Sequence, residues 1–399
     1  MSERPLVMRI ITRLAGGGPP VHATLLNRQL VKHGFDSILV FGDCSPDEMN
    51  MEYLIDSGDR VERIPMLGAN PNPAFDLVAL FQLWRLMRLY RPDIVHTHTA
   101  KAGVLGRIAA YLAGIPCVIH TYHGHVLEGY FGSFVSKALG VIEKGLAHLS
   151  TALCTVSRQQ ADELSTRFSV ASPDKFHVVP LGLDLMPFLS IPAPDFNSPR
   201  LTVGWLGRFV PIKNLPLLID IVDLAARSKL PLDFLVAGDG PERTQFEEEI
   251  RTRLLPNIRI LPWQGRVEHV IEKCHLLILT SHREGTPLAL IQGMASARPF
   301  FATPAGGNVD LMTGSCRIDR AAWWHDNGVL CSPDPKAFIQ VFKSVLADRS
   351  RLVSMSDSAR AFALSSFDEP RLVGDITSLY RKLLAEHAIR TEPVLEKSP

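Results

Sequence analysis

Residues 281–299 read SHREGTPLALIQGMASARP and directly follow the apolar run Leu276–Leu279. An unbroken apolar run of this length is typical of a buried strand in a parallel sheet. Residues 284–287, Glu-Gly-Thr-Pro, then predict a turn into an apolar helix, because Gly gives the backbone freedom and Pro suits a first helical position. The sequence therefore predicts a strand–turn–helix unit at this point of the chain.

The start of this expected helix suits an anion, because its free N–H groups and positive dipole favour phosphate above all. Glu284 and Gln292 stand eight positions apart in the sequence. At ~1.5 Å per residue they are expected close to one helical face and about 12 Å apart. That span matches a ligand with phosphates in the middle and hydroxyl-bearing rings at each end, as in a nucleotide-diphospho-sugar. An ordinary strand–turn–helix unit with a solvated Glu284 is the alternative that this segment leaves open.

The whole chain has the composition of an ordinary globular protein. Its 399 residues suggest about two domains, and 46% are hydrophobic, 21% are charged and the net charge is +1. The chain lacks the excess of basic residues that would indicate nucleic-acid binding. The six cysteines are scattered without a C-x-x-C pair, which favours reduced thiols. We find neither the apolar core of a signal peptide nor a stretch of ~20 apolar residues, and so expect a soluble, cytoplasmic protein that can still dock on a membrane surface.

Short strands and helices alternate along the first half of the chain, and the pattern restarts after a linker. This alternation predicts an α/β fold with two doubly wound, Rossmann-like domains facing a cleft. Ligands in such sheets bind outside the carboxyl ends of the strands. We expect the first domain at residues 1–185, a linker rich in Pro, Ser and Asp at 186–200, the second domain at 201–370, and a C-terminal helix and tail at 371–399.

Two glycine-rich turns lie between an expected strand and an expected helix. Gly16, Gly17 and Gly18 allow a ligand to approach the backbone, but they form neither a G-x-G-x-x-G nucleotide motif with an acidic partner nor a Walker A loop. Gly238 and Gly240 are expected to shape a nucleotide pocket. A plain tight turn remains an equal alternative at both places.

A basic turn follows the first strand of the second expected domain. Arg208 and Lys213 flank it, and two cations at the carboxyl end of a strand can neutralise a diphosphate. Arg binds such a group through two parallel hydrogen bonds, whereas Lys acts as a point charge. The alternative is an exposed basic loop. A contact from Arg266, which follows Trp263, to a base is a weaker expectation.

Histidines cluster after two expected strands of the first domain. His96 and His98 alternate along one strand and so share a face, and residues 120–125 read HTYHGH. Such clusters raise the question of zinc, but no cysteine lies nearby in the sequence, so we expect no metal. His123, next to Gly124, is the best placed to donate a hydrogen bond at the mouth of the cleft.

Together these stretches carry a family resemblance. They read HTHTAKAGVLGRIAA, HTYHGH, VVPLGLD, GRFVPIKN, AGDGPER and EGTPLALIQGMASARP, in this order along the chain. A chain with these stretches resembles the retaining glycosyltransferases of the GT-B fold, specifically glycosyltransferase family 4 (glycosyl transferases group 1). The resemblance implies that no metal is required, that the glycine turn of residues 16–18 lines the acceptor side, and that the C-terminal helix crosses back onto the first domain.

The resemblance also implies a role for each site residue. Arg208 and Lys213 would bind the donor diphosphate, Glu284 would contact sugar hydroxyls, and His123 would approach the donor sugar near its anomeric centre. The ribose would be held at position 292. The backbone that would bind phosphate belongs to Gly285, Thr286, Pro287 and Leu288.

One position departs from the family pattern, since Gln292 stands where the family has a second Glu. Gln has one acceptor oxygen and two amide donors, and its hydrogen bonds lack charge assistance. We expect a transferase that moves a sugar from a nucleotide-diphospho-sugar, most simply a UDP-sugar, to a hydroxyl acceptor. The anomeric configuration of the sugar is expected to be retained. The alternatives are a UDP-sugar epimerase of the same fold and a catalytically silent nucleotide-sugar-binding subunit.

The acceptor is expected to be a glycan or a lipid-linked hydroxyl, as in the synthesis of cell-surface polysaccharide or glycolipid. Residues 126–149 mix Phe131, Phe134 and Val135 with Lys137 and Lys144. This mixture suits peripheral contact with an anionic membrane surface. A helix packed on the core with solvated lysines explains it equally well.

Overall fold

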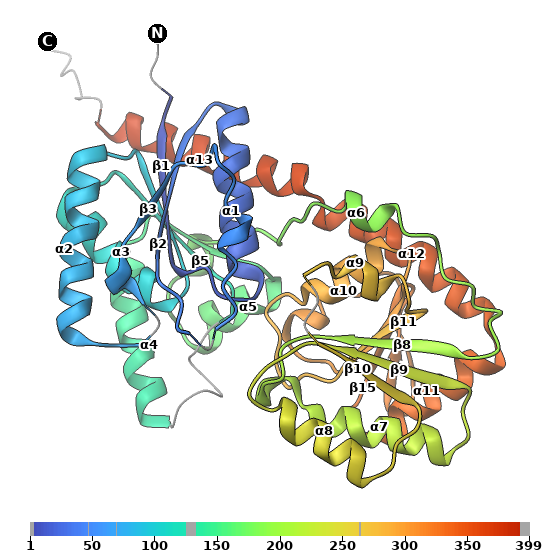
Figure 1. Cartoon of the computed structure of the whole chain (residues 1–399). Coiled ribbons are helices and arrows are strands. Elements are labelled where there is room, and N and C mark those ends of the chain that lie inside the picture. The colour runs from blue at the N-terminus through green and yellow to red at the C-terminus, as the bar shows by residue number, and fades with distance from the viewer. Residues whose placement is uncertain (1–3, 47, 69, 125–132, 263–264, 392–399) are drawn as a thin grey trace, which may run out of the picture. The chain divides into compact units, whose positions relative to one another are not determined.

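The computed structural model describes residues 4–46, 48–68, 70–124, 133–262 and 265–391. The chain divides into two compact units, called here unit 1 (Met1–Leu183 with Pro370–Pro399) and unit 2 (Asp184–Glu369). Each unit is a Rossmann-like α/β domain, with helices on both faces of a sheet (Figure 1). The predicted fold class is confirmed.

Unit 1 is built on a parallel, seven-stranded sheet in the order β3-β2-β1-β4-β5-β6-β7. Its central strands are apolar and buried on both faces, as parallel sheets require. The strands are β1 (Leu6–Arg13), β2 (Asp36–Gly42), β3 (Val61–Arg63), β4 (Ile94–His98), β5 (Cys117–Tyr122), β6 (Ala152–Thr155) and β7 (Phe176–Val178).

Two pairs of helices cover the sheet of unit 1. One face packs on α1 (Gly18–Leu30) and α13 (Glu369–Thr391), and the other on α2 (Pro73–Tyr90) and α3 (Ala100–Ala113). The C-terminal helix therefore completes the core of the N-terminal unit. The remaining elements are α4 (Ser133–His148), α5 (Arg158–Asp162), the π-helical turn η4 (Glu163–Arg167), and the 3-10 turns η1 (Val31–His33), η2 (Glu52–Leu54), η3 (Pro65–Leu67) and η5 (Pro173–Lys175).

Unit 2 is built on an eight-stranded sheet in the order β10-β9-β8-β11-β12-β15-β14-β13. Its last three strands pair antiparallel and form an edge that the sequence analysis missed, because each strand is only three or four residues long. The strands are β8 (Leu201–Leu206), β9 (Leu232–Ala237), β10 (Ile258–Leu261), β11 (Leu276–Leu279), β12 (Phe300–Ala302), β13 (Arg317–Asp319), β14 (Ala322–Trp324) and β15 (Gly328–Cys331).

The helices of unit 2 also lie on both sides of their sheet (Figure 1). α7 (Leu215–Arg227) packs against α11 (Pro335–Ala347), and α10 (Leu288–Ala295) packs against α12 (Ser350–Phe367). Within the described ranges, no helix is long and apolar enough to cross a membrane. The remaining elements are α6 (Met186–Leu189), α8 (Arg243–Thr252), α9 (Glu268–Ile271), and the 3-10 turns η6 (Pro211–Lys213) and η7 (Gly306–Asn308).

Candidate functional site

An ion pair joins two loops at the carboxyl edge of the unit 2 sheet. β8 and β11 are parallel neighbours, so the loops that follow them meet at one edge. Lys213, at the end of η6, donates from Nζ to Oε1 of Glu284 at 2.5 Å, and the two side chains are only 16% and 9% exposed. The loop turns sharply here because Asn214 adopts a left-handed conformation (φ 51°) before α7 begins. Two residues predicted to bind a ligand therefore lie in direct contact.

Both the side chain and the backbone of Glu284 are held by hydrogen bonds. Ser281 donates its hydroxyl to Oε1 at 2.5 Å, and the backbone carbonyl of Glu284 accepts from the N–H of Gly307 at 3.0 Å. Lys213 has three donor protons, so its ammonium can bind Glu284 and a second anion together. The geometry thus presents a fixed, partly buried cation at this edge.

Glu284 does not lie on the helix, which corrects the prediction that it shares a helical face with Gln292. α10 begins at Leu288, and Pro287 is its extended N-cap residue (φ −80°, ψ 95°) rather than its first helical residue. No side chain caps this helix, so its first N–H groups stay available to a ligand. Gln292 lies in the second turn of α10 and is half-buried.

The turn between β11 and α10 rests on two glycines that the sequence analysis did not single out. A Cβ on Gly306 would lie 2.1 Å from the carbonyl oxygen of Glu284, and a Cβ on Gly307 would lie 1.7 Å from that of Gly285. Only glycine permits this approach, and a Gly-Gly pair following β12 was the available signal. Within the described residues the hydroxyl oxygen of the adjacent Thr286 is buried without a partner.

Arg208 follows β8 at the same edge and is exposed. It forms no ion pair with any residue that the structure describes, so its guanidinium is available to an anion. Arg266 is also exposed, but its Nε donates to Glu268 at 2.9 Å. The neighbouring Trp263 lies outside the described residues.

The glycines of the turn after β9 have a structural role. A Cβ on Gly238 would lie 1.9 Å from the carbonyl oxygen of Gly207, and a Cβ on Gly240 (φ +152°) would lie 2.5 Å from that of Phe209. These contacts bring the turn against the Arg208 loop. Close packing of two turns accounts for both glycines without a ligand.

Five histidines gather in unit 1, close to the carboxyl ends of β4 and β5. His96, His98 and His120 are strand residues, His123 follows β5, and His22 lies in the second turn of α1. His98 Nδ1 lies 3.0 Å from His123 Nε2. Burial, followed by the charge of Arg9, lowers the pKa of His123 to about 3, and burial likewise holds the pKa of each of the other four well below its ordinary value. All five imidazoles are therefore neutral at neutral pH.

His22 was missed by the sequence analysis, although it lies only four residues after Gly18 of the glycine turn. Gly17 has a positive φ of 142°, and Gly18 begins α1, so the turn brings His22 to the other histidines. Its ring centroid lies 5.0 Å from that of His123. One nitrogen from each of His22, His98 and His123 lies within 4.8 Å of the others, a grouping able to hold a metal ion.

The turn that carries His123 is held by Gln160 of α5, a residue without a sequence motif. With its amide oriented to satisfy both of its atoms, Gln160 donates to the carbonyl of Tyr122 and accepts from the N–H of Gly124, each at 2.9 Å. The backbone on both sides of His123 is thereby fixed. Gly16 is fixed as well, since its N–H donates to the carbonyl of Met49 at 2.9 Å.

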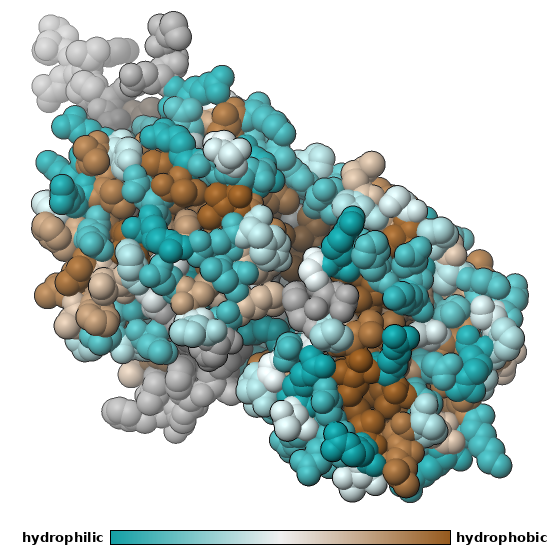
Figure 2. Space-filling view, viewed as in Figure 1, coloured by the Kyte–Doolittle hydropathy of each residue, from teal (hydrophilic) through white to brown (hydrophobic). Residues whose placement is uncertain are grey.

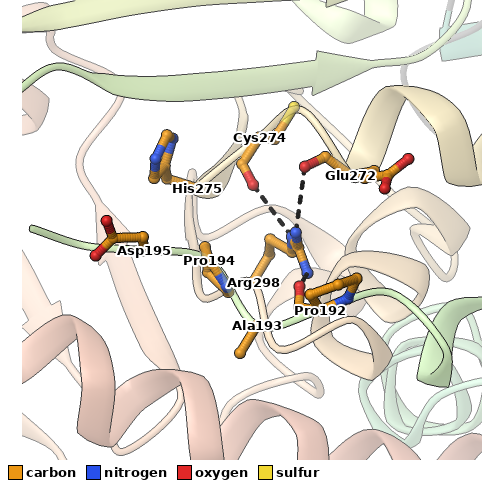
Figure 3. Close-up of a pocket in the computed structure, with 8 residues that line it drawn as sticks. All are labelled: Pro192, Ala193, Pro194, Asp195, Glu272, Cys274, His275 and Arg298. Carbon is orange, nitrogen blue, oxygen red and sulfur yellow. Dashed lines mark hydrogen bonds between the residues drawn. The ribbon is translucent and has the colours of Figure 1, made fainter. Parts of the chain in front are cut away.

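A pocket of about 270 Å³ lies elsewhere in unit 2 (Figure 3). Cys274 and His275 line it and precede β11, so it opens at the amino edge of the sheet, opposite Lys213 and Glu284. The guanidinium of Arg298 points among the lining residues and donates to the carbonyls of Pro192, Cys274 and Glu272. Its hydrogen bonds tie the segment before β8 to the body of the unit, which is a structural role.

Comparison with known proteins yields two family matches and a set of relatives. Residues 17–182 match the family described as "Glycosyl transferase 4-like domain", and residues 200–348 match "Glycosyl transferases group 1". The chain is 28% identical over 345 residues to the Escherichia coli UDP-Gal:alpha-D-GlcNAc-diphosphoundecaprenol alpha-1,3-galactosyltransferase, covering 82% of this chain and 85% of that one.

Solved structures match the fold over nearly the whole chain. Sucrose-phosphate synthase from Thermosynechococcus elongatus superposes with a TM-score of 0.76 at 19% identity, over 96% of this chain and 100% of that one. The Anabaena protein HepE in complex with UDP and glucose superposes with a TM-score of 0.72 at 17% identity, over 95% of this chain and 100% of that one.

Proposed function

Since this chain belongs to the glycosyltransferases of the GT-B fold, of the family 4 and group 1 type, we propose that it moves a sugar from a nucleotide-diphospho-sugar to a hydroxyl acceptor with retention of configuration. The observation that carries the proposal is the partly buried Lys213–Glu284 pair, at the same edge of the sheet as Arg208 and the uncapped start of α10. The name of the E. coli relative supports UDP as the donor nucleotide and a lipid-diphosphate-linked glycan as the acceptor.

In this proposal unit 2 binds the donor. Lys213 and Arg208 neutralise the diphosphate, and the first N–H groups of α10 with the hydroxyl of Thr286 bind its oxygens. Glu284, held by Ser281, accepts from hydroxyls of the sugar. Gln292 contacts the ribose from the second turn of α10.

The chemistry needs stabilisation of the departing nucleotide. The bond between the anomeric carbon and the diphosphate oxygen breaks, and its electron pair leaves with the phosphate. The acceptor oxygen forms the new bond on the same face and gives its proton to the departing phosphate oxygen. Two cations and a helix N-terminus oppose the developing negative charge, which is the main catalytic contribution that we assign to the protein.

The test compares two exposed arginines of unit 2. Arg208→Ala should lower kcat by about 10²–10³-fold, the usual effect of removing one group that stabilises developing charge. Arg227→Ala is the matched control, since Arg227 is 74% exposed on α7 and pairs only with Asp223 in the described structure. UDP binding, followed by thermal shift, should weaken in the first variant alone. Unchanged turnover and unchanged UDP binding in Arg208→Ala would reject the proposal.

A donor panel, with and without lipid-linked acceptor, separates the rival functions. UDP release that depends on the acceptor supports transfer. Isomerised donor without acceptor supports the epimerase, and binding without turnover supports the silent subunit. The departure at Gln292 is the observation that favours the silent subunit.

Peripheral membrane contact is a second part of the proposal, and it rests on α4. Val141 and Ile142 are 70% and 48% exposed, and Lys137 and Lys144 are exposed on the same helix. The opposite side of α4 is anchored, because Glu143 accepts from Arg107 and Tyr122. Phe131 and the side chains of Phe134 and Val135 lie outside what the structure describes.

Helix α2, which like α4 packs on α3, adds exposed apolar side chains. Leu77 and Phe81 are 67% and 58% exposed, and brown side chains lie over α2 in Figure 2. Arg85 and Arg88 are exposed beside them. Apolar groups flanked by cations suit the surface of an anionic bilayer.

Flotation with anionic vesicles tests this contact. Replacing Val141 and Ile142 together by Ser should reduce co-flotation, whereas Val353→Ser, at a half-exposed valine of α12 in unit 2, should leave it unchanged. Equal recovery of wild type with anionic and neutral vesicles would contradict an electrostatic contribution. Absence of co-flotation would reject the contact.

A further inference from the structure

A buried cation lies at the centre of the histidine cluster. Arg9, in the middle of β1, is fully buried and forms no ion pair with a carboxylate in the described part of the chain. Instead, its guanidinium contacts His96, His98 and the hydroxyl of Tyr380 from α13. A guanidinium only donates hydrogen bonds, so each of these partners must offer it a lone pair. This condition determines where the neighbouring protons reside.

The first consequence concerns His98 and His123. Arg9 Nη1 donates to His98 Nε2 at 3.1 Å, which leaves the proton of neutral His98 on Nδ1. His98 Nδ1 then donates to His123 Nε2 at 3.0 Å. His123 is neutral as well, so its own proton resides on Nδ1.

A second branch from Arg9 agrees with this assignment. Arg9 Nη2 donates to the Tyr380 oxygen at 3.2 Å, so the phenol hydrogen is free to point at His96 Nδ1, 2.6 Å away. His96 consequently carries its proton on Nε2, which donates to the hydroxyl of Thr121 at 2.7 Å. His96 Nδ1 also faces Arg9 Nη1 at a longer 3.4 Å, so it accepts from both groups, and each contact of the two branches has a donor and an acceptor.

The two branches end differently. The His96 branch closes on Thr121 within the core. The His98 branch ends at His123 Nδ1, which is buried and has no partner among the described residues. Both ring nitrogens of the neighbouring His22 are also buried without a partner among the described residues. Neutral His22 therefore offers one further donor and one further acceptor next to His123. Unpaired buried donors of this kind are costly, and a hydroxyl-bearing ligand would satisfy them.

We propose that Arg9, acting through His98, fixes His123 as the Nδ1–H tautomer, so that His123 donates a hydrogen bond to a sugar hydroxyl oxygen while His22 binds the same group. The inference rests on the proposed transfer function. Arg9 and His98 are positioning residues in this scheme, and His123 and His22 are the groups that touch substrate.

A metal ion on His22, His98 and His123 is the competing use of the same cluster. Binding through His98 Nδ1 would require a proton on Nε2, which would then face the Arg9 donor at 3.1 Å. Binding through Nε2 would place the metal cation directly beside the guanidinium. The donor set therefore fits a neutral hydroxyl and opposes a cation.

The tautomers are measured on the full chain, labelled selectively at the histidine ring nitrogens. Long-range ¹H–¹⁵N spectra should show Nδ1–H for His98 and His123, and Nε2–H for His96. Arg9→Met should remove the Nδ1–H preference of His123, and Arg9→Lys should restore it because the ammonium still donates. Tyr380→Phe, with Arg9 intact, should leave His123 unchanged. A wild-type His123 protonated on Nε2, or an Nδ1–H that persists in Arg9→Met, would overturn the inference.

Kinetics give the second readout. Arg9→Met should lower kcat/KM roughly five- to tenfold, as expected for one neutral hydrogen bond, with Arg227→Met, at a 74% exposed side chain of α7, as the control. If Arg9→Met does not fold, His98→Phe breaks the same relay and should give the same loss. Stoichiometric Zn²⁺ binding that disappears in His22→Asn would favour the metal and reject the relay. The spectra do not depend on turnover, so the two proposals can fail separately. If the histidines have the tautomers stated here but the protein transfers no sugar, the proposed function is rejected and the hydrogen-bond relay from Arg9 to His123 is retained.

Discussion

Gln292 is the residue that the proposed function assigns to the ribose of the donor nucleotide. It is half-buried in the second turn of α10, and its amide makes no side-chain hydrogen bond to any described residue. Gln292→Glu should tighten UDP binding by ~1–2 kcal/mol, because carboxylate hydrogen bonds to ribose are charge-assisted. Isothermal titration with UDP measures this, with Gln292→Met as the variant that should weaken binding. Unchanged or weaker affinity in Gln292→Glu would remove the ribose from this position.

At this scale the sequence predicted residue types better than their partners. Lys213 and Glu284 were expected in one site from the turns that carry them, yet their contact depends on β8 and β11 being neighbours. The sequence analysis assigned no role to Arg9. Its role follows from register, because Arg9 pairs with His96 across β1 and β4, and spacing along one strand cannot reveal that.

At the scale of elements, replacing glycine by alanine should change the free energy of unfolding in opposite directions at two positions, one in unit 2 and one in unit 1. Gly307→Ala would place Cβ 1.7 Å from a backbone carbonyl, so the turn before α10 must shift, at a cost of ~1–3 kcal/mol. Gly374→Ala, inside α13 with open space around it, should raise the free energy of unfolding by ~0.5–1 kcal/mol. Urea unfolding measures both. UDP binding should weaken in Gly307→Ala alone. Equal changes in the free energy of unfolding in the two variants would contradict the packing described.

The long elements were predictable because their apolar patterns are strong. The C-terminal helix expected from Arg371 is α13, which begins two residues earlier at Glu369. The β13–β14–β15 edge was missed because these short strands have little apolar periodicity, and β13 is exposed. The start of α10 was misplaced by one residue because Pro287 serves as its N-cap residue.

Across the whole molecule, the buried histidines should make the protein sensitive to acid. His22, His96, His98, His120 and His123 have folded-state pKa values held well below 6.5 by burial. The unfolded chain therefore binds more protons as pH falls, so stability is full above about pH 6.5 and is lost below it. Each histidine contributes a slope of roughly 1.4 kcal/mol per pH unit between its two pKa values.

Urea unfolding at pH 7.5 and 5.5 checks this slope. The free energy of unfolding should be clearly lower at pH 5.5. His22→Gln should reduce the difference, because one proton fewer is taken up on unfolding, and the exposed His33→Gln should keep it. Equal stability at the two pH values would show that the cluster titrates alike in both states.

The return of α13 to unit 1 sets an order of events during synthesis on the ribosome. Unit 1 needs Leu372, Ile376 and Tyr380 for its core, but its first 183 residues emerge about 200 residues earlier. At ~5–20 residues per second this is a wait of roughly ten to forty seconds. Unit 2, whose segment is continuous, should become protease-resistant first, although it is translated second. Nascent chains stalled near residue 220 should be cut readily within unit 1, whereas the released full-length chain, which includes α13, should be protected there.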